Sequence, residues 1–138
     1  MTEFTKIPPT ALGHVVADVM PMLEDAAKDS YYPVEHFVRR LYDGTLQLWA
    51  AIDGKNYIAI CLTEVLSYPG RRSVNICGLS GQDHTRWIDF IHEIEDAARA
   101  VGCQQVEITG RLAWRRLLPD YKQTAIVLVK ELDGQATG

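Results

Sequence analysis

The sequence predicts an α/β protein, in which a mixed β-sheet is flanked by helices and residues 1–138 form one domain. Three observations indicate this class. The length of 138 residues suits a single domain. Apolar residues recur at helical spacing in the first third, and strand-like segments alternate with helical ones after it. A strand, a helix and a strand over residues 73–109 predict a crossover that makes these two strands parallel.

The first third is predicted to be helical. Over residues 10–20 one face carries four apolar side chains, those of Leu12, Val15, Val16 and Val19. Pro21 is expected to break or kink this helix and to begin the next one, over residues 21–28. Residues 31–44 repeat the pattern with Val34, Phe37, Val38 and Leu41, and Gly44 suits the C-terminal cap.

The middle of the chain predicts three antiparallel strands. They are expected over residues 46–52, 57–65 and 73–79. The letters DGKN between the first two are typical of a hairpin turn. Pro69 and Gly70 fit the centre of a type II turn between the second and third.

The last part alternates between helix and strand. Residues 82–102 are predicted as the central crossover helix, with Ser80 and Asp83 at capping-box spacing. A strand over residues 103–109, a short helix over 111–118 and a final strand over 124–132 follow. Residues 132–138 are expected to be a flexible tail.

Composition narrows the class of protein. An apolar fraction of 47% and a net charge of −4 indicate a soluble globular protein. No apolar run reaches about 18 residues, so we expect no membrane span. No signal peptide is recognised at the N-terminus, which favours the cytoplasm. Cys61, Cys77 and Cys103 are widely spaced and are expected to be free thiols, and no metal site is expected.

The order of elements, together with DFIHEIEDAARAVGCQQVEI (residues 89–108), resembles the GNAT N-acetyltransferase superfamily over about residues 10–131. GRLAWRRLL (residues 110–118) is similar to a segment of the small GNAT-like proteins encoded by tailed phages and prophages. The resemblance implies a parallel strand pair that is splayed apart, with acyl-CoA in the gap. It also implies that the pyrophosphate of CoA meets the N-terminus of the central helix, where backbone amides and the helix dipole favour an anion.

The resemblance places the cofactor loop at GLSGQDHTRW, so the candidate cofactor-binding residues are Gly78, Leu79, Ser80, Gly81 and Gln82. The family signature Q/R-x-x-G-x-G/A is incomplete there, and Asp83 adds a negative charge beside the expected pyrophosphate. We therefore favour the alternative that Gly81 and Asp83 are turn and cap residues.

Catalytic groups are harder to place. Leu118 stands where many family members carry the tyrosine that protonates the thiolate, and leucine transfers no proton. Tyr121, three residues later, is a candidate acid, although such a tyrosine is more often a packing residue. Glu64 is a candidate base if it faces the cleft; an outward-facing carboxylate is the alternative.

Four residues predict a recognition surface: Arg111, Trp114, Arg115 and Arg116. We expect the surface to meet a protein partner rather than the phosphates of CoA. Nucleic acid is not expected as the main ligand, because no recognised nucleic-acid-binding motif accompanies these cations.

Two functions are compatible with these features. In the first, the domain has lost robust catalysis, needs no cofactor and serves as an accessory or structural component of a phage or phage-derived particle, in the host cytoplasm or with the virion. The alternative is an acetyl-CoA-dependent N-acetyltransferase acting on an unknown amine. The incomplete loop signature and Leu118 favour the first function. The oligomeric state is left open.

Overall fold

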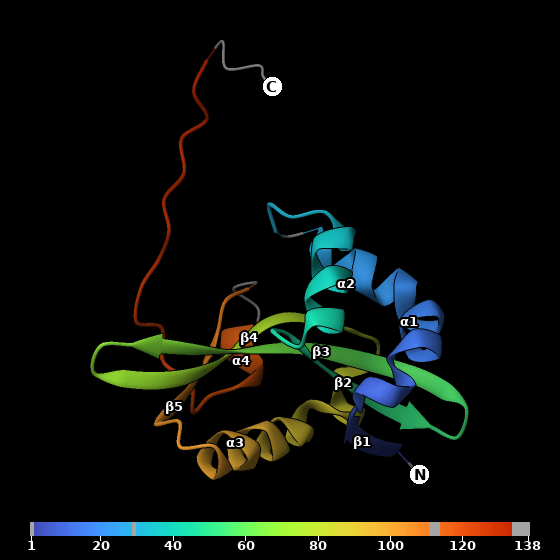
Figure 1. Cartoon of the computed structure of the whole chain (residues 1–138). Coiled ribbons are helices and arrows are strands. Elements are labelled where there is room, and N and C mark those ends of the chain that lie inside the picture. The colour runs from blue at the N-terminus through green and yellow to red at the C-terminus, as the bar shows by residue number, and fades with distance from the viewer. Residues whose placement is uncertain (1, 29, 111–113, 134–138) are drawn as a thin grey trace.

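The computed structural model describes residues 2–28, 30–110 and 114–133, and shows a sheet between two helical layers (Figure 1). Helices α1 (Leu12–Ala27) and α2 (Val34–Asp43) cover one face of the sheet. Helix α3 (Ile91–Ala100) covers the other face, and the short helix α4 (Trp114–Leu117) follows the last strand. The predicted α/β class is confirmed.

The sheet has five strands in the order β1-β2-β3-β4-β5. Their bounds are Thr2–Lys6, Gln47–Asp53, Asn56–Tyr68, Arg71–Gly81 and Gln105–Ile108. The first four pair antiparallel, and β5 pairs parallel with β4. The three predicted meander strands and the predicted parallel pair are therefore confirmed, because the crossover through α3 returns the chain in the direction of β4.

Helix α1 is one helix, so the predicted break at Pro21 is wrong. Proline removes one backbone hydrogen bond from a helix interior. The apolar stripe of the helix continues across this position, from Val15 and Val19 to Leu23 and Ala26, which are all buried against the sheet. We infer that this burial outweighs the lost bond. Helix α2 ends as predicted at Gly44, whose φ of 85° is left-handed.

The central helix begins later than the expected residue 82. Two 3₁₀ turns, His84–Arg86 and Ile88–Phe90, precede α3. Between them Trp87 is buried, and its indole N–H donates to the carbonyl oxygen of Gln82 at 2.9 Å. The expected capping box is absent here, because the hydroxyl of Ser80 lies 2.8 Å from a carboxylate oxygen of Asp25. The chain before α3 is therefore held by the buried indole of Trp87 and not by the expected capping box.

Strand β1 was not expected from the sequence. It is an edge strand, and Phe4 stacks on Trp49 and on Phe90 with ring centroids 5.4 and 5.3 Å apart. The sequence signal for β1 is weak, because polar residues surround its single aromatic residue. Only the tertiary contacts of Phe4 reveal the strand.

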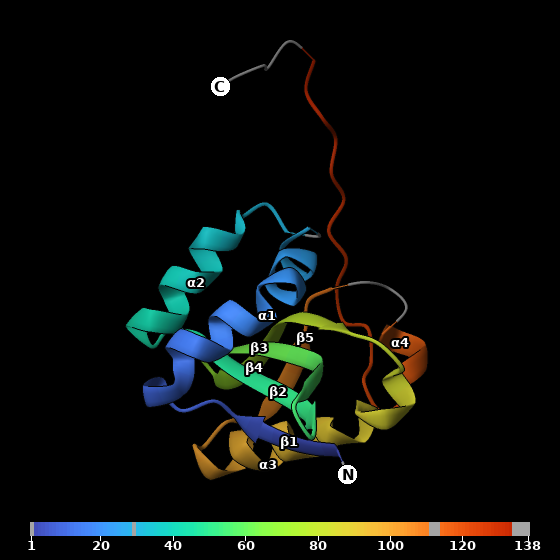
Figure 2. The same ribbon diagram turned by 90° about the vertical axis from the view of Figure 1, so that its right-hand side faces the viewer.

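The prediction of a final strand over residues 124–132 is wrong for the single chain. These residues form no strand, and the chain leaves the body of the molecule there (Figure 2). A strand needs a paired neighbour, and this segment pairs with none of the described strands. Of the expected flexible tail, residues 134–138 lie outside the described residues.

Both faces of the sheet are buried, which gives two apolar layers. One joins α1 and α2 to Leu48, Ile60 and Leu62. The other packs α3 on the face that carries Cys61 and Ile76. In the described part of the chain the three cysteines are free thiols, and no helix is long and apolar enough to cross a membrane.

Gly81 provides a test of how closely β3 and β4 approach. A Cβ atom there would lie 2.5 Å from the Cβ of Ala59 and 2.9 Å from its Cα. We expect Gly81→Ala to lower the free energy of unfolding by about 1–3 kcal/mol, as overpacking does, measured by urea denaturation. Gly13→Ala is the control, because nothing lies within 4 Å of its added Cβ. Equal stability of the two variants would contradict the close approach.

Candidate functional site

Strands β4 and β5 separate after a short region of pairing. Their ladder joins Ser73–Ile76 to Gln105–Ile108, and the Thr109 N–H then donates to the carbonyl oxygen of Ile76 at 3.2 Å. Beyond this point β4 continues to Gly81, whereas β5 has ended. A bulge lies at the separation, because Cys77 falls between Ile76 and Gly78, which pair with consecutive residues of β3. The expected divergence of the parallel pair is therefore present.

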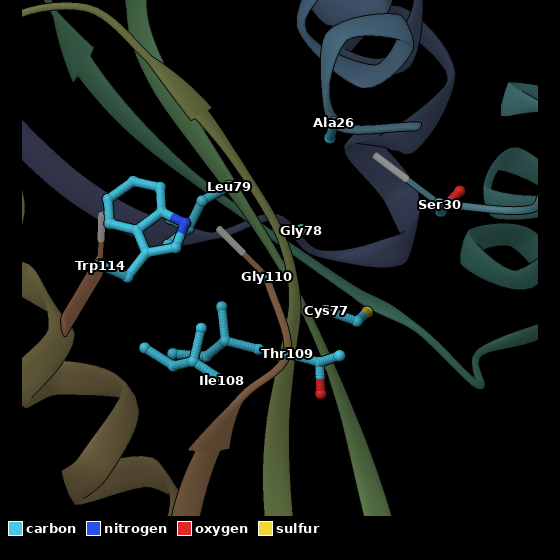
Figure 3. A pocket seen from close by; sticks show the side chains of 10 residues that line it. Ala26, Ser30, Cys77, Gly78, Leu79, Ile108, Thr109, Gly110 and Trp114 are labelled. Atoms are coloured by element: carbon cyan, nitrogen blue, oxygen red, sulfur yellow. The ribbon is translucent and has the colours of Figure 1, made fainter. Parts of the chain in front are cut away.

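A cavity of about 50 Å³ lies between the separating strands (Figure 3). We call it the splay cavity. Its lining comes from the end of α1 and the residues after it, from β4, from the end of β5 and from the start of α4: Ala26, Ser30, Ile76, Cys77, Gly78, Leu79, Ile108, Thr109, Gly110 and Trp114. One water needs about 10–15 Å³ of such space, so the cavity accommodates a group of only a few non-hydrogen atoms.

Trp114 forms one wall of the splay cavity. It is half-buried, and its ring packs edge-on against Trp87 with centroids 6.0 Å apart. Gly110 lies next to the indole, since a Cβ atom there would be in van der Waals contact with its Cδ1 at 3.4 Å. Trp114, which was predicted as part of the recognition surface, therefore lines the splay cavity.

A chain of polar side chains leads from α2 to the splay cavity. Arg40 Nη2 donates to Glu64 Oε1 at 2.9 Å, and Asn75 Nδ2 donates to Glu64 Oε2 at 2.8 Å. The hydroxyl of Thr109, which lines the cavity, then donates to Asn75 Oδ1 at 3.2 Å. The Glu64 side chain is only 17% exposed. Glu64 is therefore an inward-facing, ion-paired carboxylate that reaches the cavity only through Asn75 and Thr109.

Cys77 is the ionisable residue closest to the strand separation. Burial, together with the negative charge of Glu64, raises the pKa of its thiol to about 12. A thiol in this state is protonated at neutral pH, and the thiolate is the reactive form. Cys77 is therefore not an activated nucleophile.

Tyr121 does not line the splay cavity, but it lines a larger groove beside β5 that shares Ile108, Thr109, Gly110 and Trp114 with the cavity. Its hydroxyl donates to Glu95 Oε2 at 2.7 Å on the α3 side of the sheet. Burial and this hydrogen bond raise the pKa of Tyr121 well above its ordinary value. Leu118 is buried in the same layer. The described residues that line the cavity include no carboxyl, imidazole or phenol group.

The five candidate cofactor residues are held by contacts within the protein. Gly78 and Gly81 lie in β4 rather than in a loop, and side chains there would collide with Leu62 and Ala59. Leu79 lines the splay cavity.

The backbone near the expected pyrophosphate site is also engaged. The N–H of Gln82 donates to the carbonyl oxygen of Ile58 at 3.1 Å, and Asp83 follows with a φ of 53°. Arg86, which a phosphate could attract, forms an ion pair with Asp53. The arrangement around the cavity fits a small acyl group, but these backbone contacts do not form a cradle for pyrophosphate.

The predicted recognition surface is only partly described. Arg115 and Arg116 are exposed, and Arg115 Nη1 donates to Gln123 Oε1 at 2.7 Å. Arg111 lies outside the described residues. The exposure of Arg115 and Arg116 is compatible with a partner surface, and the role of these two residues stays a prediction. No group of His, Cys, Asp and Glu side chains that could hold a metal occurs in the described part of the chain.

Sequence reasoning missed Arg40, Asn75 and Thr109. One signal could have found Asn75, because the register of the hairpin at Pro69–Gly70 places it opposite Glu64. Arg40 lies on another element, and its approach to Glu64 depends on how α2 packs on the sheet.

Comparisons with known proteins identify the fold. No family model matches the chain, and no curated protein matches its sequence. Solved structures do match. A predicted acetyltransferase from Clostridium acetobutylicum, solved with acetyl-CoA, is 15% identical with a TM-score of 0.65, and 96% of each chain is covered. An aminoglycoside acetyltransferase from an uncultured soil metagenomic sample is 13% identical with a TM-score of 0.68, covering 96% of this chain and 97% of that one.

A GNAT family acetyltransferase of Staphylococcus aureus is 11% identical with a TM-score of 0.63, covering 95% of this chain and 98% of that one. The chain therefore has the GNAT acetyltransferase fold.

The Tyr121–Glu95 contact predicts a pH-dependent contribution to stability. Burial alone would raise the pKa of Glu95, but hydrogen bonds from Tyr121 and His92 outweigh it and lower the pKa below 4.5. A lowered carboxyl pKa contributes stability above pH 4.5, which is lost as the pH falls through the folded value. We expect Tyr121→Phe to cost about 1.5 kcal/mol at pH 7, and less below pH 4.

Chemical denaturation at the two pH values measures this difference. Tyr31→Phe is the control, because Tyr31 is 86% exposed and should cost little at either pH. A cost of Tyr121→Phe that is the same at both pH values would contradict the role of the Glu95 charge.

Proposed function

We propose that this GNAT-fold protein is an accessory or structural component of a larger particle, that it acts through protein contacts and that it does not depend on acetyl transfer. One observation carries the proposal. The described lining of the splay cavity contains no group suited to proton transfer, and the nearest ionisable group, Cys77, has a pKa of about 12. General acid–base catalysis needs a group whose pKa lies near the working pH.

The bonded N–H of Gln82 before α3 supports the same proposal. Binding of pyrophosphate there needs N–H groups that point at the anion. In this chain the Gln82 N–H is bonded to Ile58, and the Asp83 carboxylate stands beside it. The negative charge of Asp83 at this place would repel the negatively charged pyrophosphate of CoA.

The phage part of the proposal rests on the resemblance of residues 110–118 to small GNAT-like proteins of tailed phages and prophages. The particle is then a virion or a structure derived from one, and the protein is made in the cytoplasm of the host cell. Exposed Arg115 and Arg116 supply planar donors for carboxylates of a protein partner.

A second function is favoured by a different observation, the polar chain that ends at the splay cavity. In an acetyl-CoA-dependent N-acetyltransferase the cofactor supplies the activated acyl group, and the cavity has room for that group. Arg40, Glu64 and Asn75 could orient the Thr109 hydroxyl toward a bound amine, and the proton that the amine loses would pass to solvent. A structural neighbour solved with acetyl-CoA is consistent with this alternative.

Calorimetric titration with acetyl-CoA distinguishes the two functions. We expect weak binding or none, because the backbone before α3 is already engaged. A dissociation constant in the low micromolar range would contradict the proposal. If acetylation of an amine is also detected, Glu64→Gln should abolish it and Tyr121→Phe should not, since Tyr121 lies outside the splay cavity.

Charge reversal at Arg115 tests the partner surface. Arg115→Glu should weaken association with the particle by about 2–5 kcal/mol if the arginine is paired at an interface. It should change the folding stability by less than about 0.5 kcal/mol. Co-sedimentation of the tagged protein with particles from producing cells measures the first effect, and denaturation the second.

Lys55→Glu is the matched control, because it makes the same change of charge in the exposed turn between β2 and β3. Equal incorporation of both variants into the particle would show that Arg115 makes no contact with a partner.

A further inference from the structure

Residues 124–132, here named the C-terminal segment, expose an unusual amount of apolar surface. Ile126, Val127 and Leu128 are 65%, 85% and 86% exposed, and Val129 and Leu132 are also exposed. The segment is extended and projects away from the body of the molecule in both views (Figures 1 and 2). Contiguous apolar surface of this kind marks an interaction site.

The pattern of the C-terminal segment is that of a strand with two buried faces. Successive side chains of a strand point to opposite faces. Ile126 and Leu128 therefore share one face, and Val127 and Val129 share the other. Continuous apolar runs rich in β-branched residues are typical of strands covered on both sides. The segment thus has the composition of an interior strand, yet it lies in solvent.

Strand β5 supplies a matching edge. It is the last strand of the sheet, and its described residues pair with β4 on one side only. Such an edge presents backbone N–H and C=O groups that can pair with another strand. Beside it runs a groove of about 1070 Å³, here named the β5 groove, which is lined by residues 103–110 of β5 and its flanks, by α3 and by residues 120–127.

The chain is tied to its own body up to the start of the C-terminal segment. Tyr121 is bonded to Glu95 at 2.7 Å, and Gln123 accepts from Arg115 at 2.7 Å. From residue 124 to residue 133 every described residue is exposed, with no hydrogen bond to the body. Residues 124–127 border the β5 groove of their own chain, and the segment then projects away from the body (Figures 1 and 2).

We propose that the C-terminal segment adds as a strand to β5 of a second copy of this chain, and that the exchange is reciprocal. A two-fold exchange buries both apolar segments and both open β5 edges at once. No segment and no β5 edge is then left to bind a third chain, so the assembly closes as a dimer. Pairing by strand addition takes its affinity from backbone hydrogen bonds and its specificity from the alternating side chains. The proposal is independent of whether the protein binds acetyl-CoA.

The other edge of the sheet fits the segment less well. Strand β1 contains Glu3 and Lys6 and is largely exposed, and charged residues on an edge strand oppose pairing. The β5 edge carries one charged residue, Glu107, whose carboxylate accepts a hydrogen bond from Tyr68, and it lies beside the side chains of Val106 and Ile108, which pack with α3. An apolar segment with two faces to bury therefore matches β5.

Light scattering coupled to gel filtration tests the assembly. The full chain should have twice the monomer mass of 15.5 kDa. A chain ending at Gln123 should be monomeric with an unchanged circular dichroism spectrum. A full chain that stays monomeric at high micromolar concentration, or a shortened chain that remains a dimer, would overturn the proposal.

Two proline variants test strand pairing without shortening the chain. Val127→Pro and Leu128→Pro each remove one N–H, and on consecutive residues one of the two N–H groups points toward a neighbouring strand. We expect at least one variant to raise the dimer dissociation constant tenfold or more. The control, Val127→Ile, keeps the N–H and the β-branched shape and should leave the dimer intact.

Hydrogen exchange shows where the segment binds. In the dimer the amides of residues 105–108 and of the C-terminal segment should be protected, and removal of the segment should expose the edge amides of β5. A dimer with unchanged exchange at β5 would mean that the segments pair with each other, and a monomer with protected β5 would mean that the segment pairs with its own chain. Either result overturns the proposal.

Discussion

The attachment of β4 to β3 is the constraint on which the site depends. Gly78 and Gly81 let the second half of β4 lie so close to β3 that an added Cβ would meet Leu62 and Ala59. The bulge at Cys77 bends the strand just before this close contact. The pairing of β4 with β3 continues beyond the bulge to Gly81, whereas its pairing with β5 does not. The parallel ladder therefore ends at Ile76, and the splay cavity opens between the two strands.

This geometry separates the chemistry of the molecule into two places. On the α2 side, Arg40 and Asn75 hold both oxygens of Glu64, and Thr109 carries the chain of hydrogen bonds to the cavity. On the α3 side, Tyr121 and Glu95 form a separate pair that supports the packing of α3. A base and an acid that act on one bound group must both reach it. Here the two candidate residues lie on opposite faces of the sheet.

The C-terminal half of the molecule is also where the fold is least complete as a single chain. The sheet has two open edges, β1 and β5, and the apolar segment that follows α4 is exposed. A protein that works through contacts with other chains can use such an edge and such a segment. The exposed Arg115 and Arg116 lie on the helix that precedes the segment, so the proposed partner surface and the proposed exchange are neighbours in the chain.

The sequence by itself determined the class of fold, both N-terminal helical regions, the three meander strands and the parallel pair. These depend on local periodicity and on the handedness of a crossover, which a single chain displays without its tertiary contacts. It also identified Glu64 and Trp114, which the structure places next to or at the splay cavity. Tertiary structure decided the rest. The continuity of α1 through Pro21, the burial of Trp87 before α3 and the pairing of β1 result from contacts between residues distant in sequence. Residues 124–132 show the same principle in reverse: their composition is that of a strand, but a strand exists only where a neighbour offers its backbone, and the single chain offers none.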